Sequence, residues 1–246
     1  MVSCRLKNTK MKTLVLLVLL IVQQVLVYAQ ISNSDASVKL ASPIFIEEVL
    51  GKPLSPIANN DISGSPFIYE KWKSTTIKLK DGREFENVSI RINILNQTVH
   101  YLSSNGKEYV AANGIISEIQ LLDTAINSDL KTHIYRNGFS SIDNNNENTF
   151  YEVLADGKAE LLLYKKVKLT ETESLGTNVP DRQYAPFQEY YVYVANTMNK
   201  CKKNSSFFSN LFDDKKDLVT QYIDQQHLKF KSENDLKLVV DYYNSL

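Results

Sequence analysis

Cysteine and histidine are both scarce in this 246-residue chain, and each shortage excludes a kind of chemistry. The two cysteines, Cys4 and Cys201, lie on opposite sides of an N-terminal apolar run. A chain cleaved after that run therefore cannot form an intramolecular disulfide. The histidines are His100, His133 and His227, and none has a histidine, cysteine or carboxylate partner at metal-ligand spacing. We predict no metal site and no cofactor.

Glycine-rich phosphate-binding loops and catalytic motifs are missing as well. Five of the eight glycines follow Asn or Asp, which is typical of tight turns between paired strands. These five are Gly82, Gly106, Gly114, Gly138 and Gly157. No nucleophile elbow, zinc-protease motif or Walker loop occurs. Cys201 lies among lysines that would lower the pKa of an exposed thiol, but no motif supplies a base and an orienting group. We predict no catalytic residue and no enzymatic activity.

An excess of basic charge is also missing. Lys and Arg together number 28, as do Asp and Glu, and four of the basic residues lie in the first 29 positions. Without those positions the chain carries 24 basic and 28 acidic residues, a net charge of −4. This charge argues against nucleic acid as a partner and against a polybasic contact with a membrane surface.

Residues 14–22 form an uninterrupted apolar run, and basic residues precede it. Small or modest side chains follow up to Ala29, which is the order of a secretory signal peptide. The run is well short of the ~20 apolar residues that span a bilayer, so a retained membrane anchor is the less favoured alternative. We predict cleavage between Ala29 and Gln30, with Met11 as an alternative start. The mature protein would be periplasmic, associated with the outer envelope or secreted, with no transmembrane span.

Residues 75–122 have the pattern of a β-meander. Apolar residues recur at every second position from Val88 to Ile94, and Ile77 with Leu79 and Ile119 with Leu121 repeat the pattern. A period of two places these side chains on one face of a sheet. Lys78, Ser89, Arg91 and Asn93 are expected on the opposite face.

The sheet is expected to continue through residues 133–135, 150–154, 159–169 and 190–194, with a polar excursion at residues 170–186. From residue 205 the period changes to that of helices. Asp213 or Asp214 is available to cap a first helix, and Ser232 with Asp235 forms a capping-box-like start for a second. The predicted fold class is α+β and mostly β. It is an antiparallel meander and hairpin sheet, as a sandwich or partly open barrel, with two short C-terminal amphipathic helices packed against it.

The chain therefore divides into four parts: a signal peptide (1–29), a proline-containing lead-in (30–74), an antiparallel β domain (75–204) and a helical pair (205–246). In the lead-in, residues 44–46 and 67–69 are apolar enough to dock onto the sheet. Trp72, the single tryptophan, is expected to pack at the edge of the core.

Three stretches of sequence carry a resemblance to a known family. They are KLKDGREF (78–85), then YRNGF (135–139) with TFYEVLADG (149–157), and LKFKSENDL (228–236) with YYNSL (242–246). Together they resemble an uncharacterised family of exported proteins from Bacteroidota-type bacteria. The resemblance implies a cell-envelope or secreted setting, and it brings neither an activity nor functional residues.

Tyrosines near the last predicted strand are the best candidates for a partner surface, because a tyrosine ring offers a flat amphipathic face to a sugar or a protein. These residues are Tyr184, Tyr190, Tyr191 and Tyr193. Ordinary strand packing is the alternative reading of the same alternation. Asp123-Thr124-Ala125 matches a short O-glycosylation pattern for bacteria of the resembled kind, which makes Thr124 a candidate acceptor.

The favoured hypothesis for function is a non-catalytic envelope or periplasmic protein that binds an unknown protein or glycan partner. The export signal, the hairpin-rich pattern and the missing catalytic motifs support it. One alternative is a hydrolase of envelope or polysaccharide material, with carboxylates from separate strands. Another is a carrier of a lipid-like ligand, which requires a large apolar cavity. The pattern does not determine the oligomeric state.

The signal peptide and the glycosylation pattern are tested by one measurement. The intact mass of the exported protein should equal that of a chain beginning at Gln30 plus a glycan, and Thr124→Ala should remove the glycan mass. An exported protein that carries no added glycan would contradict the assignment of Thr124, and a retained N-terminal segment would contradict cleavage at Ala29.

Overall fold

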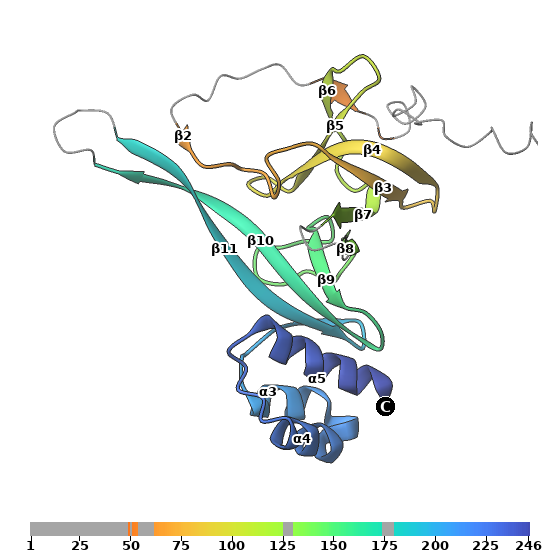
Figure 1. Cartoon of the computed structure of the whole chain (residues 1–246), viewed down its shortest axis with the longest axis vertical. Coiled ribbons are helices and arrows are strands. Elements are labelled where there is room, and N and C mark those ends of the chain that lie inside the picture. Colours follow the sequence, from red (N-terminus) through yellow and green to blue (C-terminus); the bar gives the residue numbers. More distant parts are fainter. Residues whose placement is uncertain (1–48, 50, 54–61, 125–129, 174–179) are drawn as a thin grey trace, which may run out of the picture. The chain divides into compact units, whose positions relative to one another are not determined.

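The computed structural model describes Val49 and residues 51–53, 62–124, 130–173 and 180–246 (Figure 1). All of them belong to one compact unit, which spans Leu40–Leu246. The predicted signal peptide, its cleavage site at Ala29 and Gln30, and the apolar residues 44–46 lie outside the described residues.

The described elements are twelve strands, one short 3₁₀ turn and three C-terminal helices. The strands are β1 (Lys52–Pro53), β2 (Ile62–Ser63), β3 (Lys73–Leu79), β4 (Glu84–Asn93), β5 (Thr98–Leu102), β6 (Glu108–Val110), β7 (Ile116–Thr124), β8 (Leu130–Arg136), β9 (Tyr151–Ala155), β10 (Ala159–Thr172), β11 (Asp181–Val194) and β12 (Thr197–Lys200). The helical elements are α3 (Ser205–Leu211), η1 (Asp213–Lys215), α4 (Lys216–Gln225) and α5 (Glu233–Ser245).

The described strands form a single sheet in the order β1-β6-β5-β4-β3-β7-β8-β9-β10-β11-β12, with β2 paired to β11. Neighbouring strands are antiparallel except for β2 and β11, which are parallel. The strands at the two ends of this order, β1 and β12, do not pair with each other, so the sheet is open. The predicted fold class is confirmed as mostly β and antiparallel, with helices at the C-terminus.

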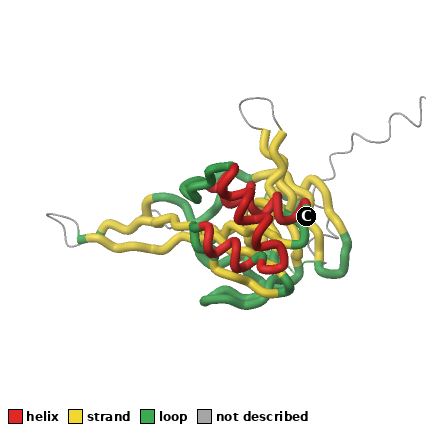
Figure 2. The backbone as a smooth tube through the Cα atoms, turned by 90° about the horizontal axis from the view of Figure 1, so that it is seen from below, coloured by secondary structure: helices red, strands yellow, loops and turns green. Residues whose placement is uncertain are grey.

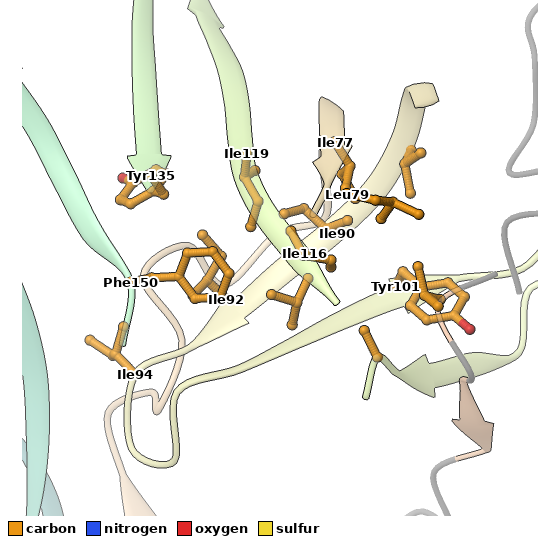
Figure 3. Close-up of a cluster of buried hydrophobic side chains, with 14 of the residues drawn as sticks. Ile77, Leu79, Ile90, Ile92, Ile94, Tyr101, Ile116, Ile119, Tyr135 and Phe150 are labelled. Carbon is orange, nitrogen blue, oxygen red and sulfur yellow. The ribbon is translucent and has the colours of Figure 1, made fainter. Parts of the chain in front are cut away.

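The alternation predicted for residues 75–122 is present in the structure. Ile77, Ile90, Ile92 and Ile119 are all at most 2% exposed and belong to one core cluster (Figure 3). Phe150, from the stretch before β9, packs into the same cluster. Burying these side chains stabilises the sheet by roughly 1.5–3 kcal/mol each.

The predicted meander is wrong in one respect, which is the partner of β7. β3 to β6 follow one another as hairpins, but β7 returns to pair with β3, through pairs such as Ile77 with Ile119. The turn at Gly114 therefore leads from β6 into β7, which lies on the far side of β3, instead of closing a hairpin. This pairing places Ile116 and Ile119 in the core, whereas β6 offers only three half-buried residues.

The predicted polar excursion at residues 170–186 is also wrong. β10 and β11 stay paired along fourteen residues each, out to Thr172 and Asp181. The outer part is held by the backbone ladder and by polar contacts such as the ion pair of Arg182 with Glu171, at 2.8 Å. The outer part of these strands buries little apolar surface, so its sequence lacks the alternation of apolar residues by which a strand is recognised. Pro186 is tolerated because β11 has neither β2 nor β12 beside it there.

The two predicted C-terminal helices are confirmed as α4 and α5. Ser232 caps α5, where its hydroxyl accepts a hydrogen bond from the Asp235 backbone N–H at 3.2 Å. The predicted cap of the first helix is wrong, because Asp213 and Asp214 lie in the 3₁₀ turn η1 and α4 begins after it without a side-chain cap. A third helix, α3, was not predicted, although Asn204 caps it through the Phe207 N–H.

The helices pack on one face of β9, β10 and β11 (Figures 1 and 2). Leu161 and Val192 of the sheet share a core with Phe208, Phe212 and helix α5. Polar contacts fix the end of α5. Asn244 accepts a hydrogen bond from the Ala159 N–H at 2.8 Å and donates one to the Ala159 carbonyl at 2.9 Å.

Asn244→Ala should lower the free energy of unfolding by about 1–3 kcal/mol, because it leaves the N–H and carbonyl of Ala159 without their protein partner. Urea denaturation followed by circular dichroism measures this change. The matched control is Ser245→Ala, next to Asn244, whose exposed hydroxyl bonds only the Tyr242 carbonyl within the same helix. The control should change stability by less than about 0.5 kcal/mol. Equal losses in both variants would contradict the anchoring role of Asn244.

Candidate functional site

A cavity of about 640 Å³ lies between the chain segment that precedes β3 and the middle of strands β10 and β11. Its lining residues are Gly64, Ser65, Phe67, Ile68, Tyr69, Ile94, Lys165, Lys166, Val167, Tyr184, Pro186, Phe187 and Gln188. Eight of these thirteen are apolar or aromatic, and the only charged ones are two lysines. A cavity of this volume falls within the range of roughly 300–1,000 Å³ that is typical of small-molecule sites.

One wall of the cavity is built by β10 and β11, by residues of one face together with the pair Lys166 and Phe187, which alternates to the other face. On the first face Lys165 pairs with Gln188 and Val167 pairs with Pro186, and Tyr184 extends the row, although its partner Leu169 does not line the cavity. The period of two places them on the same face as Leu163 and Tyr190, which pack against the helices nearer the base of the strands. Polarity therefore changes along this face: apolar under the helices, polar at Lys165, then apolar again.

The opposite wall is fixed by the segment that leads into β3. The Ile68 N–H donates to the Ile92 carbonyl at 3.0 Å, and the Ile94 N–H donates to the Pro66 carbonyl at 2.8 Å. This docking confirms the prediction for residues 67–69. Tyr69 also shares a hydrogen bond of 3.2 Å between its hydroxyl and that of Tyr135.

Phe67 is held between strand residues on the far side of this wall. The Arg91 guanidinium lies over the Phe67 ring at 4.1 Å and over the Trp72 ring at 4.2 Å. His100 meets the Phe67 ring edge-on, with ring centroids 5.1 Å apart. Trp72 is half-buried at this contact. These contacts restrict the ring without occupying the cavity.

A buried ion cluster supports the polar end of the cavity. Glu152 is 5% exposed, and its two carboxylate oxygens accept from His133 Nδ1 at 2.5 Å and from Lys165 Nζ at 2.6 Å. Burial opposes ionisation of Glu152, but the hydrogen bonds from Lys165 and His133 outweigh it and lower the pKa of the carboxyl group. Lys165 is thereby held in place as a cation at the cavity wall.

The four candidate tyrosines do not form one surface. Tyr184 lines the cavity. Tyr190 is 7% exposed and packs under the helices, where its hydroxyl donates to Glu233 at 3.2 Å. Tyr191 is fully buried on the opposite face of the sheet, and Tyr193 packs partly beside it. Strand packing, the alternative reading, therefore accounts for Tyr190 and Tyr191.

A hydroxyl–histidine–carboxylate chain occurs outside the cavity. Thr98 Oγ1 lies 3.2 Å from His100 Nε2, and His100 Nδ1 lies 2.7 Å from Glu108 Oε1. This is the order of a nucleophilic triad, but His100 is 5% exposed and the Thr98 hydroxyl donates to Asn96 at 2.7 Å. Arg91 also binds Glu108 at 2.9 Å. The chain therefore serves as an internal network of the sheet.

Cys201 is not an activated thiol. Burial raises its pKa to about 12, against a smaller opposing effect of Lys203.

Thr124, the candidate glycosylation site, is the last residue of β7, where it pairs with Leu130. Within the described ranges, no group of three or more histidine, cysteine or carboxylate residues is placed to hold a metal ion. No helix among the same residues has the length and apolar character needed to cross a bilayer.

Several residues of the cavity were missed by the sequence reasoning, and one of them had left a signal. Apolar residues occupy alternate positions of β10 from Ala159 to Leu169, and Lys165 interrupts them. A single lysine in an otherwise apolar row marks the place where the face opens to solvent or a ligand. Gln188, Pro186 and Phe187 fell within or beside the supposed excursion and gave no such signal.

The described residues thus define a mostly β protein with an open antiparallel sheet, a C-terminal helical layer and one mainly apolar cavity with lysines in its wall. No protein-family model, curated protein sequence or solved structure matches the chain.

The Glu152 cluster generates a prediction about stability and pH. Because the pKa of Glu152 is lowered in the folded state, its ion cluster stabilises the fold above the ordinary carboxyl pKa of 4.5 and stops doing so as the pH falls below it. Glu152→Gln should lower the free energy of unfolding by about 1–3 kcal/mol at neutral pH. The loss should shrink below pH 4.5, as urea denaturation at several pH values would measure.

The control for this prediction is Glu171→Gln. Glu171 also pairs with a cation, Arg182, but both side chains are about half exposed. Its removal should change stability by less than about 1 kcal/mol. A Glu152→Gln loss that does not vary with pH would show that the carboxylate charge is not what stabilises the cluster.

Proposed function

We propose that the protein is an exported, non-catalytic binding protein and that its cavity between residues 64–69 and strands β10 and β11 holds a lipid-like small molecule. Export is supported by the basic, apolar and small-residue order of the N-terminus. The observation that carries the binding role is the cavity itself: about 640 Å³, lined mainly by apolar and aromatic side chains.

The make-up of the wall favours binding over hydrolysis. A glycoside hydrolase needs two carboxylates that face one cleft. The thirteen lining residues include no Asp and no Glu, and the nearest buried acid, Glu152, already accepts from His133 and Lys165. Apolar walls instead gain free energy by removing aliphatic or aromatic surface from water.

A glycan is the second candidate ligand, because aromatic residues are frequent in the lining. Phe67, Tyr69, Tyr184 and Phe187 all contribute to it, and a sugar ring stacks on such faces. Sugars also require many hydrogen-bonding groups, and the wall offers few: Ser65 already accepts from the Phe67 N–H at 3.2 Å. A lipid-like ligand therefore matches more of the lining residues than a glycan does.

Binding of a neutral apolar fluorophore, N-phenyl-naphthylamine, tests the cavity without assuming a head group. Its fluorescence should rise on addition of the protein. Ser65→Trp, which places a large ring at the cavity wall, should weaken binding by about tenfold, or about 1.4 kcal/mol.

Ser63→Trp is the matched control, since Ser63 is exposed, lies two residues away and does not line the cavity. It should bind the fluorophore like the unchanged protein. Absence of binding in the unchanged protein, or equal effects of the two tryptophans, would remove the cavity as a ligand site. Binding of oligosaccharides in preference to the fluorophore would favour the glycan.

A further inference from the structure

Charge is distributed unevenly around the cavity. Lys165 and Lys166 are its only charged lining residues, and both are cationic. The polar pair, Lys165 with Gln188, lies toward the helices, and the apolar pairs that follow it lie toward the outer part of β10 and β11. A ligand that matches this wall has a negatively charged, hydrogen-bond-accepting end and an apolar remainder.

Lys165 retains donors for such a ligand. An ammonium group has three N–H donors, and Glu152 Oε2 is the one partner of Lys165 Nζ in the described residues, at 2.6 Å. Lys165 is about 30% exposed at its side chain, whereas Glu152 is 5% exposed, so the cation and not the acid is accessible. His133 Nδ1 lies 2.5 Å from the other carboxylate oxygen of Glu152.

Gln188 adds a neutral partner across the strand. Its Nε2 lies 3.4 Å from the Tyr190 hydroxyl, a long contact that leaves the amide able to bond elsewhere. Gln188 pairs directly with Lys165, so the two side chains stand next to each other on one face. One cation and one amide donor side by side suit the two oxygens of a carboxylate.

Beyond this pair the face becomes apolar. Val167 pairs with Pro186, and Leu169 pairs with Tyr184. Leu169 is 44% exposed and does not line the cavity, whereas its partner Tyr184 does. The four residue steps from Lys165 to Leu169 correspond to roughly 13 Å of extended strand.

We propose that the ligand is a single-chain aliphatic carboxylate, with its carboxylate at Lys165 and Gln188 and its chain along Val167 toward Tyr184. This assignment rests on the proposed function, since it deepens the ligand class of the same cavity. The ion pair with Glu152 positions the Lys165 ammonium before the ligand arrives, which lowers the cost of ordering that side chain on binding.

Displacement of bound N-phenyl-naphthylamine by alkanoates of increasing chain length tests the chain. Each added methylene buried against the wall should improve affinity about fourfold. The improvement should stop once the chain exceeds the length of the apolar face. An alkanol of equal length tests the head group and should bind about tenfold more weakly than the alkanoate.

Lys165→Met should remove this preference for alkanoate over alkanol while leaving the gain per methylene unchanged. Lys168→Met is the matched control, because Lys168 lies on the same strand, outside the lining, over the Phe187 ring at 4.9 Å. Lys168→Met should keep the preference for alkanoate over alkanol. Gln188→Met is the second variant, since it keeps the Lys165–Glu152 pair intact, and it should weaken alkanoates and not alkanols.

The outcomes separate the two proposals. Failure of the fluorophore to bind would overturn the proposed function and this assignment together. Fluorophore binding with equal affinity for alkanoates and alkanols would overturn only the carboxylate assignment. A preference for alkyl phosphates over alkanoates, or for two-chain phospholipids over single chains, would overturn it as well.

Discussion

The pairing of β10 with β11 along fourteen residues is the interaction on which the other parts of the protein depend. Strands are usually about 3–10 residues long, but these two run for 14 residues each, from a packed base to an exposed tip. At the base, Leu161 and Val192 face the helices, while Leu162 and Tyr191 on the other face pack with Phe139. Further out, the same ladder forms the cavity wall.

The cavity exists because two hydrophobic cores contact β10 and β11 at different positions along the strands. The helices cover its base on one face, and the core around Ile92 reaches the same face at Val167. Between these contacts lie Lys165 and Gln188, and Glu152 accepts a hydrogen bond from the Lys165 ammonium. A buried ion pair contributes little net stability compared with apolar residues of equal volume. Under the proposed function, the same ion pair holds the Lys165 ammonium at the cavity wall.

Much of the fold was predictable from local patterns. Alternation identified the faces of β3, β4 and β7, Asn-Gly and Asp-Gly pairs located most turns, and Ser232 located the start of α5. The errors share one cause. The partner of β7 and the outer part of β10 and β11 are set by contacts between residues far apart in sequence or by backbone ladders that bury little. The cavity, which needs residues near 67, 94, 165 and 187 together, could not be predicted for the same reason.

What the sequence by itself determined is which side chains share a face and where elements begin, because periodicity and capping act over a few residues. It also determined the excess of apolar and tyrosine side chains on β10 and β11. Only the tertiary structure decided which of them are covered: Tyr190 and Tyr191 became core, whereas Tyr184 became cavity wall. Coverage depends on what packs against a face, and those partners come from distant segments whose placement follows from burying the most apolar area at once.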